Sequence, residues 1–225
     1  MTDQGEQAVP AKCRKCDKPM SSPLVCDYCK DVNAAAIGAD YFAMLGLLQQ
    51  FELDENELRD KYVALSRHAH PDLHVGDTAA VQKLHLRVSA ALNDAYSTLK
   101  DPARRAEYLL ELLGGKSSAQ DKSVPDGFLG TMMMMQEEVA DARGGENEAE
   151  LERLRKVLQT QHDGLLRRIA GLFGELDQAV GCEAVRAGLL GEIRKQLNAV
   201  SYVKKLLSLA RRPAAGSGEN TDGTD

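Results

Sequence analysis

The chain has 225 residues, of which 43% are hydrophobic but only 4% aromatic, and it contains no tryptophan. This length predicts one or two domains, and a core built mainly from Leu, Ala, Val and Met favours helices over strands. The formal net charge of −6 argues against a general attraction to nucleic acid or to an anionic membrane surface.

The first residues, 1–11, are polar and are predicted to form a flexible lead. They lack the apolar run of a signal peptide and the arginines of an organellar presequence. No window of the chain stays apolar over the ~20 residues that a membrane-spanning helix requires. We therefore expect a cytoplasmic protein of a bacterium, with a processed organellar form as the open alternative.

Four of the five cysteines form two Cys-x-x-Cys pairs, Cys13 with Cys16 and Cys26 with Cys29. Each pair can fold as a tight knuckle, and two facing knuckles provide the tetrahedral four-sulfur site of structural zinc. Four protein ligands leave no position for water, so the expected zinc ion is structural and not catalytic. The basic neighbours that would offset the thiolate charge are Lys12, Arg14, Lys15, Lys18 and Lys30.

Residues 12–39 are thus predicted to be a zinc module followed by a linker. Reactive thiols on a disordered tail, or a redox-active or iron-bearing site, are the minor alternatives. A zinc module with basic neighbours can also bind nucleic acid, which is a competing role for this region. The fifth cysteine, Cys182, stands alone at a predicted helix start and is expected to be a small buried hydrophobic residue.

Helical periodicity predicts four helices between residues 40 and 113. They are expected at 40–48, 54–69 and 77–99, and from Asp101-Pro102 to the stop at Gly114-Gly115. The second helix places Leu58, Tyr62, Leu65 and Ala69 on one side. Because Pro71 cannot continue that helix, His70 and Asp72 are expected on a turn between two helices.

Residues 114–125 are rich in Gly, Ser, Lys and Asp and are predicted to be a linker. Three more helices are expected at 126–142, 148–180 and 182–211, and short turns between them predict a three-helix bundle over residues 126–212. Glycines at 164, 171 and 174 leave open whether the second of these helices is continuous. The polar tail, 213–225, is expected to be disordered. The predicted fold class is all-α.

Four consecutive methionines, Met132 to Met135, lie in the first helix of the predicted bundle. Consecutive helical positions point in different directions, so all four cannot enter one core. Leu129, Met132, Met133 and Gln136 are predicted to share a face, with Glu137 beside it. Because methionine is flexible and polarizable, some of these side chains are expected to face a partner.

Several stretches of the chain together resemble a J domain. They are Asp40-Tyr41-Phe42, Leu45-Gly46-Leu47, His70-Pro71-Asp72, the run from Asn93 to Pro102, and Arg105-Ala106-Glu107-Tyr108-Leu109-Leu110. The last stretch is typical of the HscB family, the J-type co-chaperones of iron-sulfur cluster assembly. Some HscB-like proteins also carry an amino-terminal four-cysteine module. The resemblance is specific over residues 40–113 and weaker, but continuous, beyond them.

The resemblance implies that the J domain binds a DnaK/HscA-type ATPase chaperone and stimulates its ATP hydrolysis without being an enzyme itself. The carboxylate of Asp72 would bind an arginine of the chaperone through charge-assisted hydrogen bonds, and His70 and Pro71 would orient it. The preceding helix would add a weaker attraction through its basic residues, Arg59, Lys61 and Arg67. Val63, Ala64 and Leu73 replace basic residues of general J proteins, which favours a dedicated chaperone over a general one.

In the HscB family the bundle binds an IscU-type scaffold on which iron-sulfur clusters are built. The resemblance assigns this client contact to Leu129, Met133, Met134, Glu137 and Tyr202. Gly130 departs from the family pattern, which has a larger apolar residue there, and leaves the register of this face open by one helical turn.

Two other functions stay open at this point: a J-domain co-chaperone with a different client, and a nucleic-acid-associated zinc protein that recruits a chaperone. An enzyme is disfavoured because no nucleophile or phosphate-binding glycine loop is present. The histidines at 68, 70, 74 and 85 could suggest a metal cluster, but His68 and His70 are too close in sequence to face one another on a helix. The sequence does not decide whether the chain dimerises.

Overall fold

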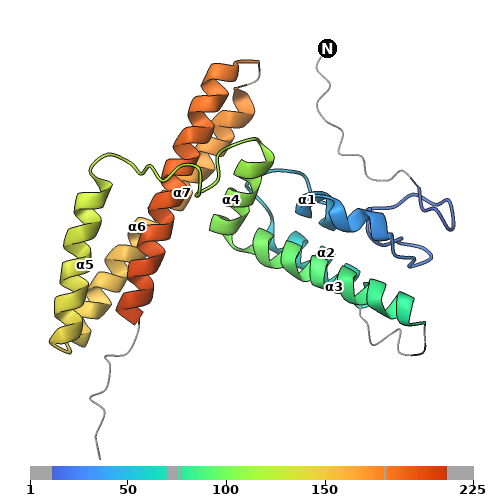
Figure 1. The fold of residues 1–225 in the computed structure, drawn as a ribbon, viewed down its shortest axis with the longest axis horizontal. Helices are drawn as coiled ribbons and strands as arrows, with labels where there is room; N and C mark the ends of the chain where they lie inside the picture. Colours follow the sequence, from blue (N-terminus) through green and yellow to red (C-terminus); the bar gives the residue numbers. More distant parts are fainter. Residues whose placement is uncertain (1–11, 70–75, 77, 180, 212–225) are drawn as a thin grey trace, which may run out of the picture. The chain divides into compact units, whose positions relative to one another are not determined.

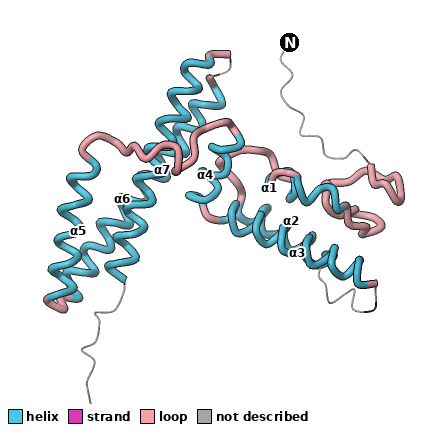
Figure 2. Tube along the Cα trace, in the orientation of Figure 1, coloured by secondary structure: helices cyan, strands magenta, loops and turns pink. Residues whose placement is uncertain are grey.

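The computed structural model of the chain describes residues 12–69, 76, 78–179 and 181–211 (Figure 1). The chain divides into two compact units, residues 1–112 and 113–225. Within the described residues the regular elements are helices, and strand pairing is limited to one antiparallel bridge between Val25 and Val32 (Figure 2). The all-α prediction is therefore confirmed. None of the described helices is long and apolar enough to cross a membrane.

The first unit contains a short 3₁₀ helix, η1, and four α-helices. Their bounds are Ala34–Gly38 for η1, Tyr41–Leu45 for α1, Glu55–Ala69 for α2, Ala79–Lys100 for α3 and Pro102–Leu112 for α4. The second unit contains three helices, α5 at Phe128–Gly144, α6 at Glu148–Gln178 and α7 at Glu183–Arg211. The helix ends lie within two residues of their predicted positions, except for the end of α1.

Helix α1 ends three residues before its predicted end because Gly46 adopts a left-handed conformation, with φ of 68°. The N–H of Gly46 donates back to the carbonyl oxygens of Ala43 and Phe42, which closes the helix. At the other end, the side chain of Asp40 accepts a hydrogen bond from the N–H of Ala43 at 3.0 Å. The helix is therefore fixed by a cap at each end.

Helices α2 and α3 lie side by side and form the main helix pair of the first unit (Figure 1). Tyr62 of α2 stacks on Tyr96 of α3, with ring centroids 4.2 Å apart. The hydroxyl of Tyr62 also donates to the side-chain oxygen of Asn93 at 2.7 Å. Asp54 caps the start of α2 by accepting hydrogen bonds from the N–H groups of Asn56 and Glu57.

Helix α4 is attached to the rest of the unit through the stretch Arg105 to Leu110. The buried guanidinium of Arg105 donates to the carbonyl oxygen of Leu99 at 2.5 Å, which satisfies an end of α3. The hydroxyl of Tyr108 accepts a hydrogen bond from the N–H of Tyr41 at 2.9 Å, and the two tyrosine rings stack. These contacts account for the arginine and the tyrosine of this stretch, and its two leucines, Leu109 and Leu110, are buried.

In the second unit α5 packs against α6 and α7 around a continuous apolar core. Its buried members are Met132, Met135, Val139, Ala142, Leu151, Leu154, Leu158, Val203, Leu206, Leu207 and Ala210. Helix α6 is continuous across Gly164, Gly171 and Gly174, although the sequence left open whether these glycines interrupt it. The segment before α5 is tied to α7, because the amide of Asn198 donates to the carbonyl oxygens of Asp121 and Ser123 at 2.9 and 2.8 Å.

Candidate metal centre and binding surfaces

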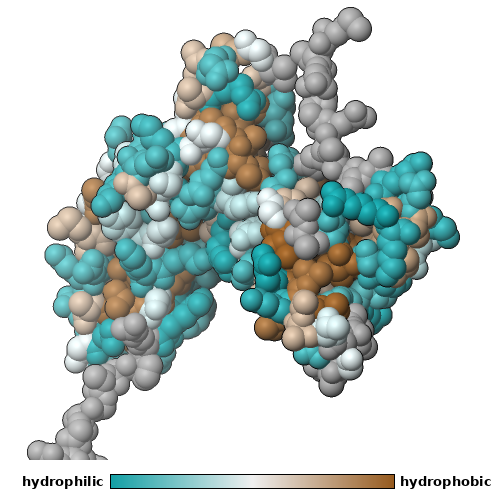
Figure 3. All heavy atoms as spheres, turned by 45° about the vertical axis from the view of Figure 1, so that its right-hand side comes forward, coloured by the Kyte–Doolittle hydropathy of each residue, from teal (hydrophilic) through white to brown (hydrophobic). Residues whose placement is uncertain are grey.

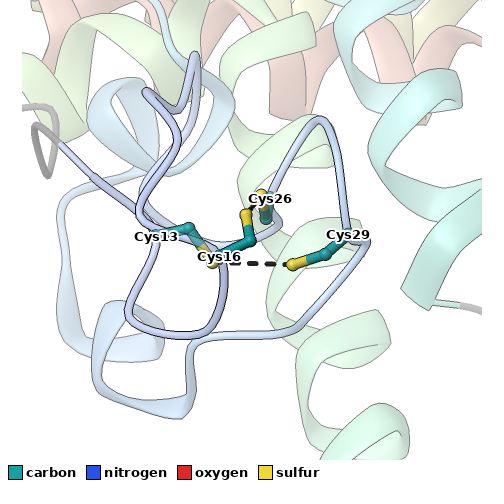
Figure 4. Close-up of side chains that lie close together, drawn as sticks. All are labelled: Cys13, Cys16, Cys26 and Cys29. Atoms are coloured by element: carbon teal, nitrogen blue, oxygen red, sulfur yellow. Dashed lines mark hydrogen bonds between the residues drawn. The ribbon is translucent and has the colours of Figure 1, made fainter.

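The four paired cysteines converge on one point in the first unit (Figure 4). Their sulfur atoms all lie within 4.8 Å of one another. Two sulfur-sulfur distances join one pair to the other, 3.6 Å between Cys13 and Cys29 and 3.6 Å between Cys16 and Cys26. A tetrahedral ion with bonds of about 2.3 Å to sulfur requires a sulfur-sulfur distance of about 3.8 Å. The residues present therefore fit a single metal ion.

The two cysteine pairs adopt the same local fold. The N–H of Asp17 donates to the carbonyl oxygen of Cys13 at 2.9 Å, and the N–H of Lys30 donates to that of Cys26 at 3.1 Å. The residue after each second cysteine is left-handed, with φ of 55° at Asp17 and 59° at Lys30. Each pair thus forms a knuckle that turns two thiols in one direction, as the sequence predicts.

The local environment makes one thiol much more acidic than another. Backbone hydrogen bonds from Cys29 and Tyr28 lower the pKa of Cys26 to about 6. The backbone N–H of Asp31 lowers the pKa of Cys29, but burial and the neighbouring thiols outweigh it and raise this pKa to about 12. Because a metal ligand must be a thiolate, a bound cation would have to displace the protons that remain.

The basic side chains around the centre do not form a strongly positive surface. Residues 12–33 carry five basic and three acidic side chains, a net charge of +2. A divalent ion with four thiolates contributes −2, so the charge of the loaded module would be close to zero. Lys12 lies 3.5 Å from Asp17, and Lys15 lies 3.3 Å from Asp31. This charge balance gives little support to nucleic-acid binding.

The structure describes three of the six predicted chaperone-binding residues, all on α2. His70, Pro71 and Asp72 lie outside the described residues. Arg59 and Arg67 are exposed on α2. Lys61, in contrast, has two partners within the protein. Its ammonium donates to the carbonyl oxygen of Gly46 and lies 3.2 Å from a carboxylate oxygen of Glu57. Its side chain is only 35% exposed.

The predicted client-binding residues lie on the surface of the second unit, where hydrophobic patches interrupt largely hydrophilic surroundings (Figure 3). Leu129, Met133, Met134 and Tyr202 are 48%, 65%, 59% and 43% exposed, and Glu137 is exposed as well.

The prediction that Met132 shares the face of Leu129 and Met133 is wrong. Met132 is buried, as is Met135, because α5 packs into the bundle core through these two positions. The methionine run therefore divides between core and surface, with Met133 and Met134 outside.

Two residues beside Tyr202 were not predicted from the sequence. The ring of Phe128, at the start of α5, meets that of Tyr202 edge to face with centroids 6.2 Å apart. Lys205 places its ammonium 5.6 Å from the centre of the Tyr202 ring. The spacing of Tyr202 and Lys205, three positions apart on one helix, was the available signal for the second contact. Phe128 brings Tyr202 next to the start of α5, where Leu129 lies.

Comparison with known proteins decides the family. A family model described as the DnaJ domain matches residues 40–108, and one described as the HSCB C-terminal oligomerisation domain matches residues 124–208. The co-chaperone protein HscB homolog of Neisseria meningitidis is 30% identical over 162 residues, which cover 71% of this chain and 98% of that protein. The chain belongs to the HscB co-chaperone family.

Other HscB proteins are similar to this chain in sequence or in fold. The HscB homolog of Aeromonas salmonicida is 32% identical over 149 residues, covering 65% of this chain and 87% of that protein. The crystal structure of human HscB superposes with a TM-score of 0.71 at 22% identity, covering 88% of this chain and 96% of that one. HscB from Vibrio cholerae superposes with a TM-score of 0.61 at 29% identity, covering 76% and 94%.

The HscB family assignment leaves the cysteine module outside both matched segments, since the first begins at residue 40. The fifth cysteine differs from its prediction: Cys182 is exposed, because it precedes the first turn of α7 and follows the left-handed Gly181. Among the described residues, the four paired cysteines are the only group placed to hold a metal ion. Of the suggested histidine cluster, His85 is buried in α3, while His70 and His74 lie outside the described residues.

Proposed function

We propose that this HscB-family protein delivers an IscU-type iron-sulfur scaffold to a DnaK/HscA-type chaperone and stimulates the chaperone's ATP hydrolysis. The observation that carries the proposal is the joining, in one chain, of a DnaJ-domain match and an HscB C-terminal match. In this scheme residues 40–113 act on the chaperone and residues 126–212 bind the client. The protein itself breaks no bond; it is an activator.

The chaperone contact would combine one directional interaction with a diffuse one. The carboxylate of Asp72 would accept charge-assisted hydrogen bonds from an arginine, with His70 and Pro71 fixing the turn. Arg59 and Arg67 are exposed on α2 and would attract an acidic surface of the chaperone, an effect that salt weakens. In this scheme Lys61 contributes charge only in part, because its ammonium already contacts Gly46 and Glu57.

The client contact would lie where large apolar side chains remain exposed on α5 and α7. Leu129, Met133, Met134 and Tyr202 would form its hydrophobic part, and Glu137 would set its polarity. Burying exposed apolar side chains of this size supplies most of the energy of a small interface. Methionines adapt to the shape of a partner because their side chains are flexible.

The cysteine centre is proposed to hold zinc. Soft thiolate ligands in a closed set of four suit zinc, and such a site has a structural role. The thiols also suggest a reducing compartment, so we propose a bacterial cytoplasm, which the bacterial relatives support.

The decisive experiment measures ATP hydrolysis by the partner chaperone with and without the scaffold. The double variant Leu129→Ser/Met133→Ser should abolish scaffold binding, and with it the extra stimulation by scaffold, while basal stimulation by the J domain stays. His70→Gln should abolish both. The matched control is Val157→Ser, which also removes an exposed apolar side chain, 42% exposed, but on α6. Unchanged scaffold affinity in the double variant would disprove the client surface, and intact stimulation by His70→Gln would disprove the chaperone contact.

A further inference from the structure

We propose that the metal centre is energetically coupled to α2 through Ser21, Gly46 and Lys61. Ion binding at the four cysteines would then stabilise the helix that carries Arg59 and Arg67. Lys61 acts here as a positioning residue that connects the module to α2. The inference concerns metal affinity and helix stability, and it holds whether or not the proposed chaperone contact is correct.

The first step joins the second knuckle to the loop between the knuckles. Asp27, which follows Cys26 directly, accepts hydrogen bonds from the N–H and the hydroxyl of Ser21, both at 2.7 Å. These two bonds tie Ser21 to the residue that directly follows the ligand Cys26. Displacement of Cys26 would therefore displace Ser21.

The second step joins that loop to the end of α1. A Cβ atom built on Gly46 would lie 2.5 Å from the carbonyl oxygen of Ser21, so the two backbones are in closer contact than any side chain allows. The hydroxyl of the buried Ser22 donates to the carbonyl oxygen of Met44 at 2.9 Å. Close packing and a buried hydrogen bond together transmit a displacement of the loop to α1.

The third step joins the end of α1 to α2. The ammonium of Lys61 donates to the carbonyl oxygen of Gly46, and it also lies 3.2 Å from Glu57 one turn earlier in α2. The oxygen that Lys61 contacts thus belongs to the residue against which Ser21 packs. A displacement of Gly46 would leave a partly shielded ammonium without one of its two acceptors.

The ion matters because the loop has little structure of its own. Within residues 17–25 the structure contains no helix or strand, only the bridge that Val25 makes with Val32. Leu24 and Cys26 are nonetheless fully buried. A short loop of this kind depends on the bound metal ion for a fixed structure. The free energy of metal binding would therefore contribute to the folding of this loop.

Coupling between two sites is reciprocal, which makes the proposal testable from either end. Loosening the contacts at Gly46 and Lys61 must weaken metal binding if the metal stabilises those contacts. Measured couplings of this kind change affinity by about 5- to 150-fold.

The test measures the Zn²⁺ affinity of the full chain by competition with a chromophoric chelator, under reducing conditions. Lys61→Met and Gly46→Ala should each weaken Zn²⁺ binding by at least about 5-fold. The matched control is Lys83→Met, which removes an exposed lysine from α3 of the same unit and should leave affinity unchanged. Unchanged affinity in Lys61→Met would overturn the proposal, even if Gly46→Ala misfolds.

A second readout follows α2 directly. Hydrogen exchange of residues 55–62 should become faster when Zn²⁺ is removed from the wild-type chain by a chelator, whereas exchange in α6 should not change. Equal exchange in α2 with and without Zn²⁺ would also overturn the coupling. Neither measurement involves a chaperone or a scaffold, so failure here is distinct from failure of the proposed function.

Discussion

The cysteine module and the three-helix bundle are stabilised in different ways. The bundle has a core cluster of eleven buried apolar residues drawn from three helices. The buried cluster around the cysteines of the module consists of Cys13, Met20 and Cys26, and two of these three belong to the metal centre. Around the cysteines, coordination therefore takes the place of a larger hydrophobic core, and the two regions should respond to different perturbations.

Removal of the ion should produce the largest effect, and only in the module. In zinc-finger peptides a structural site contributes about 10–16 kcal/mol of apparent binding energy. Cys26→Ser should therefore lose most of its Zn²⁺ affinity and expose residues 12–33 to limited proteolysis, while the bundle resists. Cys182→Ser removes an exposed thiol and is the control that should keep full affinity. Equal protection of the module in both variants would contradict a structural ion.

A cavity in the bundle core should destabilise the bundle and leave the cysteine module unaffected. Leu158 is fully buried in the core, so Leu158→Ala should lower the free energy of unfolding of the second unit by about 2–5 kcal/mol. Zn²⁺ affinity should not change. Val157→Ala, at the exposed neighbouring position, should change the stability by no more than about 0.5 kcal/mol. Chemical denaturation, monitored by circular dichroism, measures the free energy of unfolding of both variants.

A smaller effect is expected where the segment before α5 is tied to α7. Asn198→Ala removes both donors to the carbonyl oxygens of Asp121 and Ser123, at a cost of about 1–3 kcal/mol. Hydrogen exchange in residues 117–125 should become faster. Ser201→Ala, on an exposed turn of the same helix, is the control. If both variants exchange at the wild-type rate, these hydrogen bonds do not hold the segment.

The smallest expected effect tests the electrostatic influence of Lys30, in the module, on His68 of α2. Burial lowers the pKa of His68, and the positive charges of Lys30 and Arg67 lower it further. Lys30→Met should therefore raise this pKa by a small amount without restoring the ordinary value, since burial remains. Titration by NMR on the Zn²⁺-loaded chain measures the change; Lys83→Met should give the wild-type value.

The sign of the pH effect follows from the same shift. The pKa of His68 is lower in the folded chain than in the unfolded chain, so the unfolded state binds the proton more readily. The stability that neutral His68 contributes is present above the unfolded pKa of about 6.5, and it is lost as the pH falls below that value and through the lower pKa of the folded chain.

The sequence predicts local features of this chain well. Helix starts at Asp40, Asp54 and Asp101 follow from a capping side chain within three residues. The metal centre follows from the pair spacing, because each knuckle is formed by residues within one short turn. These predictions succeed because the interactions that decide them involve neighbours in sequence.

The features that the sequence does not predict depend on residues far apart in the chain. Lys61 resembles a free basic residue of α2, and only the position of the Gly46 carbonyl, fifteen residues earlier, engages its ammonium. Met132 and Met133 have the same chemistry, so their separation into core and surface depends on how α5 rotates against α6 and α7. Cys182 departs from this pattern, since it is exposed at the start of α7 directly after its left-handed neighbour Gly181.

The division of the methionine run gives α5 two different chemical sensitivities. Peroxide reaches exposed thioethers first, so Met133 and Met134 would become sulfoxides while Met132 and Met135 stay shielded in the core. A sulfoxide is polar and would weaken an apolar contact surface without opening the bundle. Oxidative damage to this helix would therefore impair recognition before it impairs folding, and methionine sulfoxide reductases could reverse it.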